Sequence, residues 1–176
     1  AISAARLGLH VALIQDRPVL GGNGSSEVRV WPEGHTNQQP YPRVGDVVSE
    51  LVRKKGGGDG NSKNAHVYDD QRKLKLAQAE PNLTLMLNQR VNSAVTDRTF
   101  SSARQGEGDN QRRKIYSVIA QHTITGERLN VRGDMFLDAT GDGVLGAIVG
   151  ADFEMTHEGH MGASNLWNVG ATSKNE

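Results

Sequence analysis

The 176-residue chain contains no cysteine, few aromatic residues and no excess of either charge. The lack of cysteine excludes a disulfide framework, a thiolate zinc site and a cysteine-bound iron–sulfur cluster, but it leaves the cellular compartment undecided. The 20 basic and 20 acidic residues cancel, so bulk charge does not favour a nucleic acid or an anionic membrane. No apolar run approaches the ~18 residues of a membrane span. We therefore expect neither a nucleic-acid partner nor a membrane partner.

Glycine, by contrast, is abundant. It occupies 21 of the 176 positions, or about 12%, against a usual level of ~7%. This excess predicts tight turns and places where the backbone can approach a ligand closely. The length fits one domain with a sizeable core. Because the sequence opens at Ala1 inside a helical pattern, we expect the chain to be a fragment of a longer protein.

Hydrophobic spacing predicts that helices and strands alternate along the first half of the chain. Helix-forming residues fill positions 1–7, and Gly8 follows where a helix commonly ends in a left-handed residue. The apolar run 10–15 favours a strand. Spacing and end signals predict the remaining elements of this half: helices at 46–54 and 68–79, and strands at 27–31 and 83–87.

The second half is predicted to be mainly antiparallel. Three segments favour strands of a meander: 89–97, 115–125 and 128–132. The polar segment 98–114 is expected to be a loop between the first two of them. Residues 135–137 (MFL) favour a buried strand that leads into 138–143 (DATGDG), and helical spacing resumes at 144–149.

Asp16 stands directly after the predicted strand 10–15. A helix, a strand and a terminal acid together are typical of the second half of a dinucleotide-binding βαβ unit, in which the acid binds both ribose hydroxyls. The glycine fingerprint of such a unit is expected about 20 residues upstream, and thus ahead of Ala1. The alternative is a solvated strand end in which Arg17 is the ion partner of Asp16.

The loop 20–26 (LGGNGSS) is the second candidate site. Gly21 and Gly22 lack side chains, so the backbone can pass close to a pyrophosphate or a ring system and offer N–H groups to it. Asn23, Ser25 and Ser26 add short polar side chains. A plain glycine turn without a ligand is the other interpretation of this loop.

The motif 138–143 is the third candidate site, because it lies between a predicted strand and a predicted helix start. Its small residues permit close contact, and its amides can face an anion. Asp142 could hold a ribose or ribityl hydroxyl, while Thr140 and Gly141 could line a cofactor. The alternative role for Asp142 is to cap the following helix, and both roles can coexist.

Five segments together resemble the FAD-dependent oxidoreductases of the two-dinucleotide-binding-domain, glutathione-reductase-like superfamily. The closest resemblance is to a broad family of bacterial proteins named FAD dependent oxidoreductase. The matching segments occur in family order: 4–8 (AARLG), 11–23 (VALIQDRPVLGGN), 26–31 (SEVRVW), 81–88 (PNLTLMLN) and 137–143 (LDATGDG). The family more often has Glu where this chain has Asp16, a shortening that keeps the charge.

The resemblance implies an α/β fold: a partial Rossmann-like FAD-binding domain with a central parallel sheet and a three-stranded antiparallel meander. It implies that residues 1–150 form this partial domain and that 151–176 begin a truncated substrate domain. The first strand and its glycine fingerprint are absent from the sequence, as is the final cofactor-binding segment. The implied cofactor is FAD, and the implied partner is a small-molecule substrate.

The resemblance implies that particular residues of this chain contact the cofactor. Asp16 matches the acid that binds the adenosine ribose, and Val91 matches a strand position whose backbone faces adenine. Arg17 matches the residue beside that acid, and Gly21, Gly22 and Asn23 match the loop near the phosphates and the flavin side of the cofactor. Thr140, Gly141 and Asp142 match the late motif that meets the flavin chain. Ser26 and Ala139 are further cofactor-binding candidates. No catalytic acid or base is assigned, because sequence alone does not bring candidates within hydrogen-bond reach.

The resemblance predicts an enzyme that transfers a hydride between a small organic substrate and the flavin. A noncatalytic nucleotide-binding module, including a degenerate flavoprotein, is a second hypothesis. An NAD-dependent Rossmann enzyme is a third, although it gives no reason for the meander or for the motif 138–143. His157, Glu158 and His160 invite a metal interpretation, but they lack the helical histidine pair of a zinc site, and we expect no metal.

Overall fold

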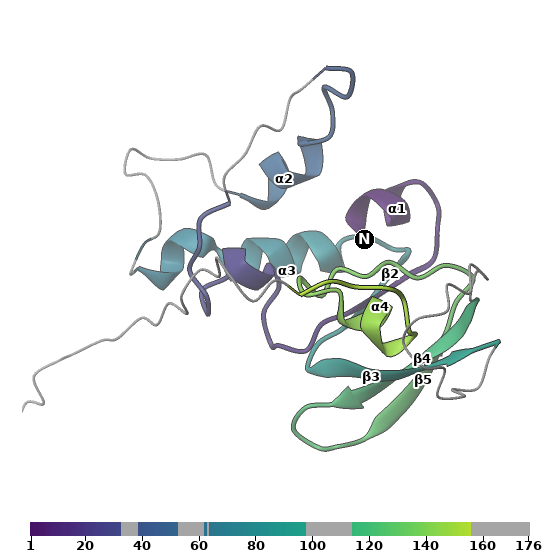
Figure 1. The fold of residues 1–176 in the computed structure, drawn as a ribbon. Helices are drawn as coiled ribbons and strands as arrows, with labels where there is room; N and C mark the ends of the chain where they lie inside the picture. The colour runs from purple at the N-terminus through teal and green to yellow at the C-terminus, as the bar shows by residue number, and fades with distance from the viewer. Residues whose placement is uncertain (33–38, 53–61, 63, 98–113, 156–176) are drawn as a thin grey trace, which may run out of the picture.

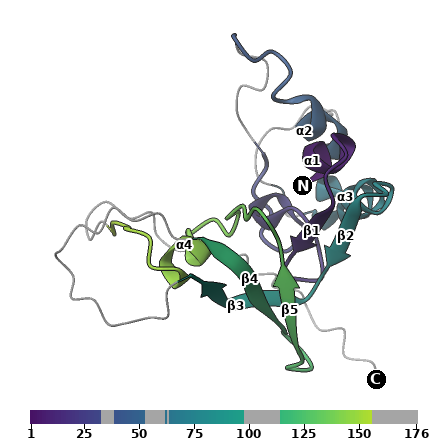
Figure 2. The same cartoon turned by 90° about the vertical axis from the view of Figure 1, so that its right-hand side faces the viewer.

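The computed structural model describes residues 1–32, 39–52, 62, 64–97 and 114–155. Within these residues the fold is mixed α/β, with a two-stranded parallel sheet and a separate three-stranded antiparallel sheet. Both views of the ribbon place the parallel pair together with helices α1, α2 and α3, while the antiparallel meander forms the other part of the molecule (Figures 1 and 2). No helix among the described residues is long and apolar enough to cross a membrane.

Strand β1 (Val11–Ile14) pairs with β2 (Leu83–Met86) in parallel register. Helix α1 (Ile2–Arg6) precedes β1, and Gly8 makes the turn between them at φ 91°. Helix α3 (Asp70–Gln78) precedes β2 and packs against it. The predictions of helices at 1–7 and 68–79 and of strands at 10–15 and 83–87 are therefore confirmed, with shorter ends in the structure.

The meander consists of β3 (Gln89–Thr96), β4 (Ile115–His122) and β5 (Arg128–Arg132) in antiparallel order. The prediction of this sheet is confirmed, including the tight turn between β4 and β5. Its best-buried residues lie on β4, where Val118 is 3% exposed and Ala120 is fully buried. Helix α4 (Val144–Ile148) packs against β3 and buries Leu145. Figure 1 shows α4 beside the meander.

Two predicted strands are wrong. Residues 27–31 form no strand: Arg29 adopts a left-handed φ of 64°, and its amide donates to the carbonyl of Ser25. This segment therefore folds back on the glycine-rich loop instead of extending. Residues 135–137 are neither paired nor buried, since Met135 is 89% exposed and Leu137 is 84% exposed. Among the described residues no strand lies beside them, so their backbone joins no ladder.

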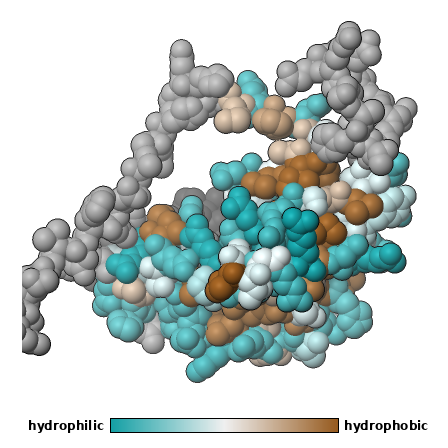
Figure 3. Space-filling view, turned by 90° about the horizontal axis from the view of Figure 1, so that it is seen from below, coloured by the Kyte–Doolittle hydropathy of each residue, from teal (hydrophilic) through white to brown (hydrophobic). Residues whose placement is uncertain are grey.

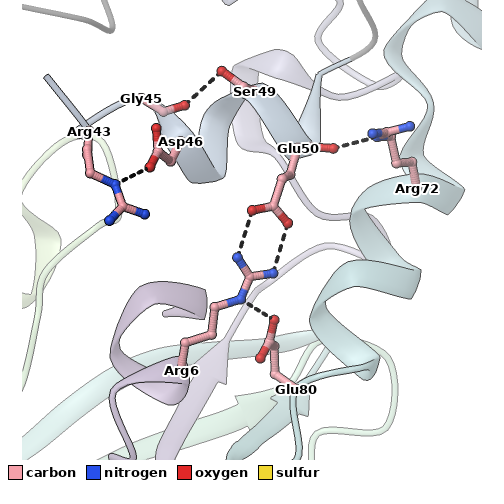
Figure 4. A network of polar contacts seen from close by, with 8 residues as sticks. All are labelled: Arg6, Arg43, Gly45, Asp46, Ser49, Glu50, Arg72 and Glu80. Carbon is pink, nitrogen blue, oxygen red and sulfur yellow. Dashed lines mark hydrogen bonds and ion pairs between the residues drawn. The ribbon is translucent and has the colours of Figure 1, made fainter.

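Helix α2 (Asp46–Leu51) is held to the rest of the fold by charged side chains. Glu50 accepts two hydrogen bonds from the guanidinium of Arg6 at 2.7 and 2.9 Å, and its backbone carbonyl accepts one from Arg72. Arg6 also binds Glu80 at 2.7 Å (Figure 4). The predicted helix 46–54 is confirmed as far as Leu51, and its last two residues lie outside the described part of the chain.

Seen from below, brown apolar patches on the surface are separated by hydrophilic residues (Figure 3).

The packing around Ala120 generates a stability prediction. Replacing this fully buried residue by leucine overfills the space at the meander, and we expect the free energy of unfolding to fall by about 1–3 kcal/mol. The same substitution at exposed Ala79 is the matched control, expected to change stability by less than about 0.5 kcal/mol. Urea unfolding measures both values, and equal midpoints for the two variants would contradict the packing described here.

Candidate functional site

Asp16 lies just beyond the carboxyl end of β1, on a backbone that is fixed on both sides. The carbonyl of Gln15 accepts a hydrogen bond from the amide of Gln89 at 2.9 Å, and the carbonyl of Arg17 accepts one from Asn88 at 3.3 Å. The carboxylate itself is exposed and binds no other described residue. A fixed backbone therefore presents an uncommitted carboxylate at the strand end, as a ribose site requires.

Arg17 is not the ion partner of Asp16. Its guanidinium lies 3.7 Å from the carboxylate of Glu27 instead, and both of these side chains are more than a third exposed. The alternative interpretation, in which Arg17 is the ion partner of Asp16 at a solvated strand end, is therefore wrong about Arg17. The pair between Arg17 and Glu27 joins the strand end to the segment after the glycine-rich loop.

Val91 lies at the same end of the parallel pair as Asp16. It is two residues beyond Gln89, whose amide reaches the carboxyl end of β1, and it pairs with Ala120 of β4. The register of β3 shifts between Val91 and Ser93, which marks an irregularity in the strand at this point. The structure thus places Val91 on the strand that begins beside the end of β1 where Asp16 lies.

The glycine-rich loop has an unusual backbone. Gly21 and Gly22 have φ of 112° and 53°, in the region where only glycine is free of strain, and a short 3₁₀ turn (Gly22–Gly24) follows. Ser25 is fully buried beneath the turn, and its hydroxyl donates to the carbonyl of Gly22 at 2.7 Å. The loop is therefore an ordered turn with internal hydrogen bonds.

The loop also offers hydrogen-bond donors. The amides of Gly21, Gly22 and Asn23 are on exposed residues and donate to no acceptor within the described part of the chain. A Cβ built at Gly22 would meet nothing within 4 Å, so open space lies in front of it. Successive unpaired backbone N–H groups at a turn form an anion-binding surface. The residues present fit a pyrophosphate.

Ser26 contributes less to this surface than the sequence suggested. Its amide already donates to the carboxylate of Asp70 at 3.1 Å, and its carbonyl accepts from the Arg29 guanidinium at 2.7 Å. Its backbone therefore anchors the loop, and only the hydroxyl stays available to a ligand.

In the motif 138–143, Asp138 organises the turn that precedes α4. One oxygen of its carboxylate accepts from the amide and the hydroxyl of Thr140 at 3.0 and 2.7 Å, and the other accepts from the amide of Gly146 at 3.0 Å. Burial by itself raises the pKa of Asp138, but hydrogen bonds from three backbone amides and one hydroxyl outweigh it and lower that pKa below its usual value.

The capping role predicted as one possibility for Asp142 belongs to other residues. The hydroxyl of Thr140 accepts from the amide of Val144 at 2.9 Å, while Gly143 occupies the N-cap position in a left-handed conformation. Asp142 is exposed, and its side chain binds no described residue. Its carboxylate is therefore uncommitted, like that of Asp16.

Sequence reasoning missed the role of Asp138. The signal was present in the pattern Asp-Ala-Thr, because an aspartate commonly accepts a hydrogen bond from the amide two residues later. Ala139 and Gly141 are exposed beside it, and Gly141 has a φ of 89°. A Cβ built at Gly141 would meet nothing within 4 Å, so this corner also faces open space.

The end of β1 that carries Asp16 and the helix that follows the motif 138–143 both contact strand β3. The amide of Gln89, at the start of β3, is bonded to the carboxyl end of β1, and α4, which follows the motif, packs against β3. No group of three or more histidine, cysteine or acidic residues suited to a metal occurs in the described ranges. His157, Glu158 and His160, which invited a metal interpretation, lie outside these ranges.

A comparison of the sequence with models of known protein families identifies the family. The family model described as FAD dependent oxidoreductase matches residues 1–169. The chain belongs to the FAD dependent oxidoreductase family. The sequence resemblance to this family is confirmed, and FAD is the cofactor that membership implies. A search of the curated proteins finds no match.

The hydrogen bonds of Asp138 generate a prediction with a defined pH dependence. Because its pKa is lowered in the folded protein, its contribution to stability is present above the unfolded pKa, near 3.8, and is lost as the pH falls through the folded pKa. Asp138→Asn cannot accept the bond from Gly146 with its amide nitrogen, and we expect it to lower the free energy of unfolding by about 1 kcal/mol at pH 7.

Urea unfolding of Asp138→Asn and the wild type at several pH values measures this difference. It should shrink as the pH falls below about 4, where the wild-type carboxylate becomes protonated. Asp142→Asn is the matched control and should leave stability unchanged, because its side chain binds no described residue. A difference between Asp138→Asn and wild type that is constant with pH would contradict the assignment.

Proposed function

We propose that this chain binds FAD through the three candidate segments, and that the protein transfers a hydride between a small organic substrate and the flavin. The observation that carries the proposal is the set of uncommitted polar groups at family-matched positions. These are the carboxylate of Asp16, the amides of Gly21, Gly22 and Asn23, and the carboxylate of Asp142. Membership of the family supports FAD rather than NAD as the ligand.

Each segment has a chemical role in this proposal. Asp16 accepts hydrogen bonds from the ribose hydroxyls, and the backbone beside Val91 faces adenine. The three loop amides bind the pyrophosphate, with Arg17 and the Ser26 hydroxyl beside them. Residues 139–142 lie along the flavin side, where Thr140 and Asp142 offer oxygens to a hydroxylated chain. Bound FAD supplies the hydride-accepting and hydride-donating chemistry, and the protein supplies orientation and electrostatics.

We further propose that residues 1–150 form part of the FAD-binding domain, in a Rossmann-like arrangement, and that 151–176 begin a substrate domain. A noncatalytic nucleotide-binding module is the second candidate function. It is favoured by the absence of an identifiable catalytic acid or base among the described residues, and the two candidates differ in whether a substrate reduces the bound flavin.

An absorbance experiment distinguishes these functions. The purified protein, supplied with FAD and freed of excess cofactor, should show the flavin band near ~450 nm. Under anaerobic conditions, a panel of small hydroxylated compounds should include one that bleaches this band. A colourless protein after incubation with FAD would overturn the proposed function. Bound flavin that no compound of the panel bleaches supports the noncatalytic module.

The role of Asp16 is tested by Asp16→Asn. Loss of the charge weakens both hydrogen bonds to the ribose, and we expect the Kd for FAD to rise by about tenfold. Asp134→Asn removes the same charge at another exposed position and should leave the Kd within about twofold. Quenching of FAD fluorescence on titration measures both values. An unchanged affinity for Asp16→Asn would remove Asp16 from the cofactor site.

A further inference from the structure

The first turns of α3 contact the underside of the glycine-rich loop through Lys73. This lysine is only 6% exposed, although most lysines lie in solvent. A Cβ built on Gly21 would lie 3.0 Å from both Cδ and Cε of Lys73, which is tighter than most Cβ contacts in proteins. The backbone of Gly21 therefore packs against the aliphatic part of the lysine side chain.

The ammonium group of Lys73 ties this contact to the polar part of the loop. It donates to the carbonyl of Tyr68 and lies 3.6 Å from the carboxylate oxygen Oδ1 of Asp70. The same Oδ1 accepts the amide of Ser26 at 3.1 Å. One carboxylate oxygen thus joins the buried cation to the end of the loop. These partners offset the cost of burying the charge.

Tyr68 fastens the segment that follows the loop to the same place. Its hydroxyl donates to the carbonyl of Arg29, its ring is 3% exposed, and the ring of Trp31 lies 6.1 Å away from it. The amide of Val30 in turn donates to the carbonyl of Asn23 at 2.9 Å. The loop is therefore held at both ends by residues 68–73.

Two adjacent glycines have more conformational freedom than any other residue pair, so ordering them costs more entropy. A loop ordered before the ligand arrives avoids this cost on binding, which raises affinity. We propose that Lys73 and Asp70 are positioning residues: they hold Gly21, Gly22 and Asn23 in the conformation that presents their amides to the FAD pyrophosphate. This inference rests on the proposed function, and it assigns neither residue a contact with the cofactor.

The test compares Lys73→Met with Lys75→Met in the purified protein. Both variants remove one positive charge from α3 and keep an unbranched side chain, but Lys75 is exposed and its side chain forms no hydrogen bond or ion pair with the described residues. We expect the Kd for FAD to rise by about tenfold in Lys73→Met and to stay within about twofold in Lys75→Met. Fluorescence quenching measures affinity, and thermal unfolding checks that each variant is folded.

A second readout concerns the loop without cofactor. In ¹H–¹⁵N spectra recorded without FAD, the amide signals of Gly21, Gly22 and Asn23 should shift or broaden in Lys73→Met and match the wild type in Lys75→Met. Unfolding or a global rearrangement would instead move signals throughout the protein. Wild-type affinity together with unchanged loop signals in Lys73→Met would overturn the positioning role, while failure of the wild type to bind FAD would overturn the proposed function instead.

If Lys73→Met does not fold, Asp70→Asn decides the question. Asparagine keeps an oxygen for the Ser26 amide but loses the charge that pairs with the ammonium of Lys73. The expected result is a rise in the FAD Kd of about three- to tenfold, with rescue by Asp70→Glu, which restores the charge. Affinity within twofold of wild type in Asp70→Asn contradicts the proposal.

Discussion

The junction between the two sheets fixes the strand end that carries Asp16. It consists of two backbone hydrogen bonds, from the amides of Asn88 and Gln89 to the carbonyls of Arg17 and Gln15. Asn88 makes the turn with a φ of 56°, a left-handed conformation that asparagine tolerates better than most residues. Because these bonds satisfy the backbone on both sides of Asp16, its side chain projects from a fixed strand end and is free to bind a ligand.

A second constraint follows from the need to pair buried polar groups. In the glycine-rich loop, the carbonyls of Gly21 and Gly22 accept hydrogen bonds within the loop, while the amides of Gly21, Gly22 and Asn23 donate to no acceptor among the described residues. In the motif 138–143, Asp138 takes up the amides that begin α4, which leaves Asp142 uncommitted. In both places internal hydrogen bonding holds the backbone, and the groups left over are those that match cofactor positions of the family.

Much of the fold could be predicted from the sequence because local signals agreed with the tertiary packing. The meander followed from alternating strands and a tight turn. The strands of the parallel pair followed from apolar runs, and their parallel arrangement was implied by the family resemblance. The strand predicted at 27–31 failed because alternation does not report a left-handed residue such as Arg29. The strand predicted at 135–137 failed because an apolar triplet forms a strand only when another strand lies beside it.

The sequence by itself determined the family, the FAD cofactor that the family implies and the positions of the three candidate segments, since these depend on residue order and spacing. Only the tertiary structure decided which groups in those segments are free, because residue order does not fix which hydrogen bonds form, and some partners, such as Asn88 and Gln89 beside Asp16, come from distant parts of the chain. Lys73 shows the difference: its helical position is plain in the sequence, but its burial beneath Gly21 depends on how α3 packs against a loop some fifty residues earlier.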